Sequence, residues 1–216
     1  MIIVTGSGRS GTSFLCKVLM RCGCHFRGGW DEKIKAGLED PLIVHFNEEL
    51  FKNYGLNTVT DFLSDEQVAE LAYKYKIPLK KCAQQINFVK DPRFCKTLEV
   101  WLKAGAKVEF VIVCLRNISS VVKSAIDYSG EEVNSLELAK SWHNQILARL
   151  GTLFNILYQY EVNFQPIIFP KDYLASLESS NLSPNLQSLA KRLDIEQKIL
   201  KKAIKQEFRP EMIKFL

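Results

Sequence analysis

The residues best suited to chemistry lie in a glycine-rich loop near the start of the chain. An apolar run, Met1 to Val4, comes first, and a helix is predicted to begin at about Thr12. A strand, a loop and a helix in this order gather backbone N–H groups and the positive end of a helix dipole around one point, which favours an anion. Glycines at positions 6, 8 and 11 let the backbone approach that anion closely. We therefore expect an anion-binding loop, with the candidate residues Gly8, Arg9, Ser10, Gly11, Thr12 and Ser13.

Residues that are absent from this loop exclude some classes of anion-binding loop. Gly6 and Gly11 have the spacing of a nucleoside-triphosphate loop, but Thr12 stands where such a loop has its phosphate-binding lysine. An ATP or GTP hydrolase is therefore disfavoured. The same glycines also fit a dinucleotide fingerprint, and Asp31 and Glu32 lie near the distance expected of its ribose-binding acid. Because no central strand is evident after the first helix, this second alternative is weakened but stays open.

The hydrophobic pattern predicts an α/β fold in which strands alternate with helices. We expect a single domain over residues 1–216, with a parallel sheet of about four to five strands, helices on both faces and a P-loop NTPase-like arrangement. The segment 107–115 is almost continuously apolar, which is typical of a central strand. The other expected strands are 1–4, 86–89 and 166–169, and the expected helices are 14–22, 41–54, 94–105, 118–126 and 135–160, with one or two more over 186–206. Further helices start at Ser64, with Gln67 in a capping box, and at Lys171.

Three of the expected strands end in cationic residues. Arg9 follows the first strand, Lys90 the second and Arg116 the third. The carboxyl ends of parallel strands meet at one edge of a sheet, where ligands bind, and like charges placed there repel one another unless an anion lies between them. Ser124 follows Arg116 by eight residues on the next helix, within reach of the same phosphate. The ligand is predicted to carry more than one negative charge.

Composition excludes several other classes of protein. The 29 Lys and Arg against 24 Asp and Glu give a net charge of +5, a modest excess that does not indicate a nucleic-acid partner. The six cysteines lack the pairing of a disulfide scaffold or a metal site, and we interpret them as free thiols in a reducing compartment. No apolar run is long enough for a membrane span, and the first strand leaves no room for a leader segment. We expect a cytoplasmic protein without a metal.

Together, the loop and the strand ends resemble the sulfotransferases that use 3′-phosphoadenosine 5′-phosphosulfate (PAPS). The 5′-phosphosulfate loop of that family is matched by Arg9-Ser10-Gly11-Thr12-Ser13, and its 3′-phosphate motif by Arg116 and Ser124. The segment Lys90-Asp91-Pro92-Arg93 is similar to the lysine-bearing strand end of bacterial and tyrosylprotein-type members. The resemblance covers roughly residues 1–20, 86–126 and 165–200.

The resemblance implies a role for each matched residue. The backbone of Gly8 to Thr12 would hold the 5′-phosphosulfate, and Arg9 would neutralise the bridging and leaving oxygens. Lys90 would contact the sulfuryl group, while Arg116 and Ser124 would bind the 3′-phosphate. Phe14 stands where many members stack a tryptophan on adenine, although its spacing fits a core residue equally well. The implied reaction is transfer of the sulfuryl group to a hydroxyl or amine of an unidentified acceptor, and it depends on positioning and charge stabilisation.

This sequence does not match the general base of the sulfotransferase family. Pro92 occupies the position of the histidine that small-molecule members use. Tyrosylprotein-type members use a glutamate some twenty residues beyond the loop arginine, which favours Asp31 or Glu32 here; weaker candidates are Glu39, Asp40 and His45. Two alternative functions stay open, a kinase-like protein with a degenerate P-loop and a non-catalytic nucleotide-binding module. The sequence does not identify the acceptor or the oligomeric state.

Overall fold

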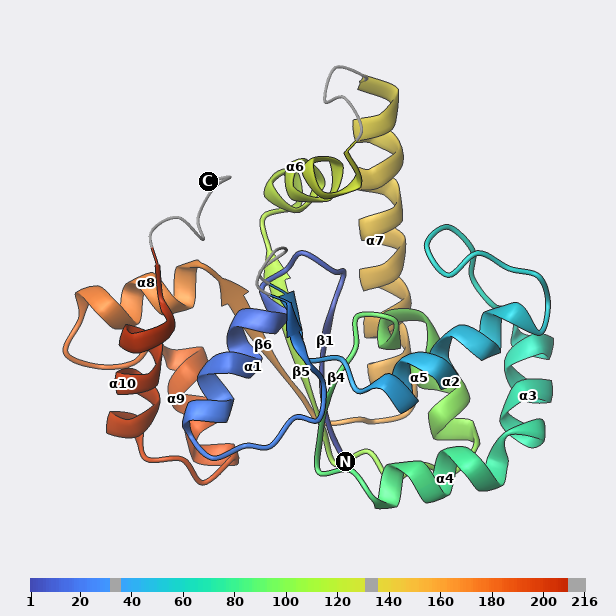
Figure 1. The fold of residues 1–216 in the computed structure, drawn as a ribbon, viewed down its shortest axis with the longest axis horizontal. Coiled ribbons are helices and arrows are strands. Elements are labelled where there is room, and N and C mark those ends of the chain that lie inside the picture. Colours follow the sequence, from blue (N-terminus) through green and yellow to red (C-terminus); the bar gives the residue numbers. More distant parts are fainter. Residues whose placement is uncertain (32–35, 131–135, 210–216) are drawn as a thin grey trace.

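A computed structural model describes residues 1–31, 36–130 and 136–209 of the chain. It has an α/β fold with a four-stranded parallel sheet in the order β4-β1-β5-β6. The strands are β1 (Ile2–Gly6), β4 (Phe88–Lys90), β5 (Phe110–Arg116) and β6 (Phe164–Phe169). The predicted fold class is confirmed, and β5 is an interior strand as expected. Figure 1 shows the sheet in the middle of the molecule, with helices on either side.

The helices divide between the two faces of the sheet (Figure 1). One face is covered by α1 (Thr12–Arg21), α8 (Lys171–Glu178), α9 (Pro184–Arg192) and α10 (Gln197–Glu207). The other is covered by α2 (Pro41–Lys52), α3 (Asp65–Lys74), α4 (Lys76–Gln84), α5 (Phe94–Lys103) and α7 (Leu136–Gln159). Helix α6 (Ile118–Ser129) follows β5 and packs on α7 through a smaller apolar cluster.

Alternation along the strands explains why there are two cores. Ile3, Val111 and Val113 belong to the apolar cluster under α5 and α7, whereas Val4 and Ile112 belong to the cluster under α1 and α9. Successive side chains of a strand point to opposite faces, so a continuous apolar run such as that of β5 supplies both clusters. The sheet is therefore fixed from both sides, and its carboxyl edge is held in place.

The hairpin strands β2 (Trp30–Asp31) and β3 (Ala36–Gly37) and the helix α4 were not predicted from the sequence. The glycine-rich stretch after α1 contains this short antiparallel hairpin. Helix α4 contains Pro78 at its third residue, where the backbone nitrogen needs no helical partner, so proline does not break it. The predicted capping box at Ser64 is confirmed, and α2 begins after Asp40, whose side chain accepts from the Leu42 and Ile43 N–H groups. Among the described residues, no helix combines the length and the apolar character needed to cross a bilayer.

Candidate functional site

The loop between β1 and α1 has the geometry of an anion cradle. It turns tightly after the strand, where the Gly8 N–H donates to the Gly6 carbonyl at 2.8 Å. Gly8, Arg9 and Gly11 all have positive φ values, of 75°, 54° and 94°. Gly11 is the N-cap of α1 and offers no side-chain acceptor to the first helical turn. The N–H groups of that turn are therefore available to an anion in addition to the helix dipole.

Close contacts explain two of the glycines in this loop. A Cβ at Gly6 would lie 2.4 Å from the Cys114 carbonyl oxygen of β5 and 2.4 Å from Ser10 Oγ. A Cβ at Gly11 would meet the Phe169 ring of β6 at 2.7 Å, in a left-handed conformation that already favours glycine. The loop is thus pressed against the carboxyl ends of β5 and β6.

Arg9 links the loop to helix α6. Its Nε donates to Ser124 Oγ at 3.0 Å, and its guanidinium lies 5.0 Å from the centre of the Tyr128 ring. The resemblance assigned Arg9 to the bridging and leaving oxygens of the phosphosulfate, but here its side chain reaches the residue assigned to the 3′-phosphate. Tyr128 is more than half exposed and offers a flat aromatic surface beside these charges. Sequence reasoning had not assigned Tyr128 to this charged group.

Arg116 approaches the same loop from the end of β5. Its Nη1 donates to the Arg9 carbonyl at 3.3 Å, and its guanidinium lies 5.3 Å from the centre of the Phe169 ring. Its Nε and Nη2 are buried without a hydrogen-bond partner. Burial and, secondly, the positive charge of Arg9 lower the pKa of Arg116. Within the described residues, no carboxylate forms a salt bridge with Arg9 or Arg116.

Unpartnered polar atoms surround this loop. Ser10 is 1% exposed, and its Oγ has no hydrogen-bond partner. Together with Arg116 Nε and Nη2, and with Nε of Arg149 from α7, it accounts for four of the six buried side-chain polar atoms that lack a partner in the described part of the chain. Buried polar groups are almost always hydrogen-bonded, so such a group of unused donors is what a phosphate-sized acceptor would satisfy.

Arg149 is a site residue that sequence reasoning missed. Its Nη1 donates to the Ser7 carbonyl at 3.3 Å, and its Nη2 to the Val59 carbonyl at 2.6 Å. Burial lowers the pKa of Arg149. The one signal in the sequence is that this arginine lies three residues from Ile146 and four from Leu153, on the side of α7 that carries apolar core residues. Arg149 joins the anion loop to the segment before α3.

A buried lysine lies beside Arg149. Lys96 of α5 is 5% exposed, and its Nζ donates to the Asp61 carbonyl at 2.7 Å. The ammonium lies 4.8 Å and 5.0 Å from the ring centres of Phe51 and Phe62. Burial and, secondly, the charge of Arg149 lower the pKa of Lys96 to about 8. Sequence reasoning had also given this lysine no role.

Lys90 does not join the two arginines. Parallel pairing places it beside Val4 of β1, as the strand-end prediction required. Its side chain is 2% exposed and donates to the Gly37 carbonyl at 3.0 Å, and it forms a salt bridge with Glu39. Ser13 Oγ donates to the same Gly37 carbonyl at 3.4 Å. Lys90 is thus held by Gly37 and Glu39, and Gly37 also contacts the start of α1.

The structure gives the candidate general bases different surroundings. Asp31 lies exposed on β2, and Glu32 is outside the described residues. Asp40 caps α2 and forms a 2.5 Å salt bridge with Arg27, which gives it a structural role. His45 is exposed on α2. Among the described candidates, Glu39 is the carboxylate that the structure pairs with Lys90, although the resemblance favoured Asp31 and Glu32.

Two other expectations are settled by packing. Phe14 is 6% exposed and meets Phe169, Tyr173 and Phe208 edge-on, so it is a core residue and does not offer a face to adenine. All six cysteines are free, and burial raises the pKa of Cys95 to about 11 and that of Cys114 to about 12. Among the described residues, no three His, Cys, Asp or Glu side chains gather as metal ligands.

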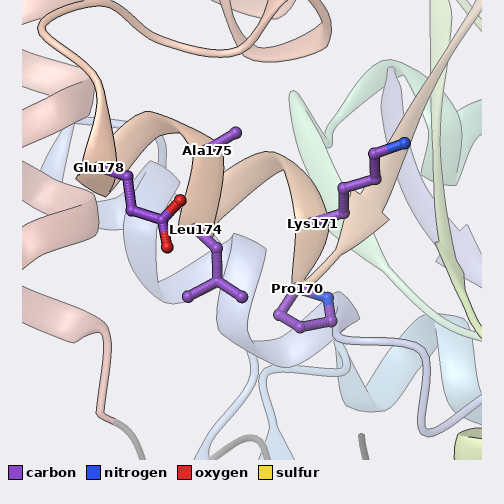
Figure 2. A pocket seen from close by; sticks show the side chains of 5 residues that line it. All are labelled: Pro170, Lys171, Leu174, Ala175 and Glu178. Carbon is purple, nitrogen blue, oxygen red and sulfur yellow. The ribbon is translucent and has the colours of Figure 1, made fainter.

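A shallow hollow lies along α8, after the end of β6. Its volume is about 360 Å³, and Pro170, Lys171, Leu174, Ala175 and Glu178 line it along one face of α8 (Figure 2). Lys171 and Glu178 lie at opposite ends of that face, and the residues between them are apolar. None of the predicted site residues lines this hollow.

Comparisons with known proteins add no family assignment. No protein-family model matches the chain, and the curated proteins contain no significant match. The likeness to sulfotransferases therefore depends on the loop and the strand-end residues themselves.

Proposed function

We propose that the protein is a PAPS-dependent sulfotransferase that moves a sulfuryl group to a hydroxyl or amine acceptor. The observation that carries this proposal is the uncompensated charge of Arg9 and Arg116 beside Ser124. Two guanidinium groups share one corner, have no carboxylate partner among the described residues, and leave buried N–H groups unused. A nucleotide with separate 3′ and 5′ anionic groups would satisfy both the corner and the neighbouring loop.

The donor nucleotide fits the residues present. The loop from Gly8 to Thr12, with the unpartnered Ser10 hydroxyl and the first turn of α1, would hold its 5′-phosphosulfate. Arg116 and Ser124 would hold its 3′-phosphate, and Arg9, which touches both, would share that charge. The nucleotide supplies the sulfuryl group, and this chain supplies the donors that neutralise it. Thr12 in place of a P-loop lysine favours this donor over ATP.

The acceptor would be activated by Glu39, with Lys90 as its partner. Glu39 is partly exposed, whereas Lys90 is buried, so the carboxylate can receive a proton while the ammonium stays in place. The lysine would also lower the cost of negative charge near the transferring group. The six free cysteines suit a reducing compartment such as the cytoplasm.

The proposal is tested first by ligand-induced thermal stabilisation. The parent and Arg116→Ala would be titrated with adenosine 3′,5′-bisphosphate, 5′-AMP, NAD and Mg-ATP. A ligand at a hundred times its Kd adds ~2.7 kcal/mol to the free energy of unfolding. We expect the bisphosphate to stabilise the parent selectively, and Arg116→Ala to lose that response.

The other outcomes identify the alternatives. Stabilisation by Mg-ATP without a response to the bisphosphate would favour a kinase-like protein, and stabilisation by NAD would favour the dinucleotide fingerprint. Selective bisphosphate binding, followed by no transfer of labelled sulfate to phenol, amine or sugar acceptors, would indicate the non-catalytic module. If Glu39→Gln binds bisphosphate like the parent but transfers at least tenfold more slowly, the assignment of the base is supported.

A further inference from the structure

The corner between α3 and α4 presents apolar side chains to solvent. Tyr73 is 84% exposed and Ile77 is 79% exposed, the two largest values among the large hydrophobic residues described. They lie on either side of Tyr75, where one helix ends and the next begins. Isolated exposed apolar residues are common, but two such residues projecting from one corner need a reason.

The same corner carries an unbalanced positive charge. Between Leu71 and Val89 the chain has four lysines and no Asp or Glu. Lys76, Lys80 and Lys81 are exposed, and none of them forms a salt bridge with a residue that the structure describes. The preceding acid, Glu70, accepts a hydrogen bond from the Tyr54 hydroxyl at 2.6 Å. Three unpaired ammonium groups therefore flank the two apolar side chains.

The corner is rigidly mounted on the core. The Tyr75 N–H donates to the Leu71 carbonyl at 2.9 Å at the end of α3, and the Leu79 N–H donates to the Tyr75 carbonyl at 3.0 Å at the start of α4, so Tyr75 is bonded to both helices. Val68, Leu71 and Leu79 are buried on the inner side. The outward direction of Tyr73 and Ile77 follows from this anchoring and needs no further ordering.

We propose that this corner, defined by Tyr73, Lys76, Ile77, Lys80 and Lys81, docks the protein on an anionic lipid surface. An aromatic and an aliphatic side chain would enter the interface between headgroups and acyl chains, while the lysines stay at headgroup level. Each lysine near a negatively charged leaflet adds to the attraction. Such binding is reversible and peripheral, because the buried apolar area is small and no described helix spans a bilayer.

The position of the corner agrees with this mode of binding. Helix α4 ends just before β4 begins, so it lies at the amino ends of the strands (Figure 1). The anion loop follows the carboxyl end of β1, at the opposite end of the sheet (Figure 1). A bilayer that contacts the corner would leave the proposed nucleotide site open to water.

A lipid surface is favoured over nucleic acid by the apolar pair. A nucleic acid would be bound by the lysines, and its affinity would depend little on Ile77, which can neither stack on a base nor bind a phosphate. A bilayer uses both kinds of residue together. Tyr73 can stack on a base as well as enter a bilayer, so the two partners differ in how they respond to loss of Ile77 alone.

The test is co-sedimentation of the full chain with vesicles. We expect binding to mixed phosphatidylcholine–phosphatidylserine vesicles that is at least about tenfold stronger than binding to pure phosphatidylcholine. Lys76→Glu/Lys80→Glu/Lys81→Glu should weaken the binding by more than about tenfold, and Tyr73→Ser/Ile77→Ser by about tenfold. The matched control, Lys198→Glu/Lys202→Glu/Lys205→Glu, makes the same charge change on exposed or partly exposed lysines of α10 across the sheet, and it should change the binding less than about threefold.

Three results would overturn the proposal. The first is no preference for phosphatidylserine; the second is an equal loss in the α10 control, which would mean that net charge alone governs binding. The third is tighter binding to a single-stranded RNA than to vesicles, together with vesicle binding that Ile77→Ser does not weaken. Because all the changed residues are exposed or partly exposed, each variant should unfold at the same temperature as the parent. A variant that does so and binds vesicles less well has lost binding through its changed surface and not through unfolding.

Discussion

Lys90 and Arg116 end strands on either side of β1, yet among the described residues only Lys90 has a carboxylate partner. Lys90 is 2% exposed and has a carboxylate partner in Glu39 and a carbonyl partner in Gly37. Arg116 has one carbonyl bond, to Arg9, and its Nε and Nη2 have no partner. A buried charge costs free energy unless it is paired. The described part of the chain thus balances the charge of Lys90, whereas it leaves the charge of Arg116 for a ligand to balance.

The largest expected effect separates these two cations in the absence of ligand. Lys90→Met should lower the free energy of unfolding by about 2 kcal/mol, because the Glu39 carboxylate and the Gly37 carbonyl lose their donor. Arg116→Met should change it by less than about 0.5 kcal/mol or raise it, because a half-buried charge with two unpartnered N–H groups is removed. Urea unfolding of both variants measures the difference. A larger loss in Arg116→Met than in Lys90→Met would mean that Arg116 is structural and would break the comparison.

A smaller effect is expected at Arg149, which anchors the loop without facing the 3′-phosphate corner. Arg149→Met removes the bonds to the Ser7 and Val59 carbonyls, and we expect roughly fivefold to tenfold weaker binding of adenosine 3′,5′-bisphosphate, equivalent to about 1 kcal/mol. Arg192→Met is the matched control, since Arg192 is an exposed arginine of α9 that lies over Phe110. Fluorescence or calorimetric titration measures both affinities. Equal affinities in the two variants would remove Arg149 from the site.

The smallest effect concerns pH and Lys96. Its pKa is lowered from 10.5 to about 8 in the fold, chiefly by burial, so between these values the unfolded chain binds more protons and stability rises with pH. The gain should be of the order of 1 kcal/mol after allowance for solvent screening. The difference in unfolding free energy between the parent and Lys96→Met, measured from about pH 7 to pH 10.5, isolates the contribution of Lys96. The cysteines titrate in both proteins, so their contribution cancels. A difference that does not change over this range would contradict the assignment.

Local patterns predicted the parts of the site that lie at strand ends. The apolar run of β5 fixed the strand that Arg116 ends, and the glycines after β1 predicted a loop beside it. Ser124 follows Arg116 by eight residues, and the structure joins the two through Arg9, whereas their shared phosphate stays a prediction. Such features join residues that are close in sequence, and the periodicity of strands and helices predicts where these residues lie.

Contacts between distant segments could not be predicted in this way. Glu39 meets Lys90 across 51 residues, and Arg149 meets Ser7 across 142. Both pairings depend on how the hairpin and α7 pack on the sheet, and a side chain's partner across such a distance leaves no periodic signal. The unexpected direction of the Arg9 side chain has the same origin, because α6 brings Ser124 and Tyr128 close to it only after folding.

The most direct test of the central claim is a calorimetric titration of the parent and Arg116→Met with adenosine 3′,5′-bisphosphate and with 5′-AMP, which lacks the 3′-phosphate. If Arg116 is kept unpaired for that phosphate, removing either the arginine or the phosphate should weaken binding at least about tenfold, and removing both should cost little more than removing one. Losses that simply add, or an Arg116→Met variant that binds the bisphosphate like the parent, would show that Arg116 does not bind the 3′-phosphate.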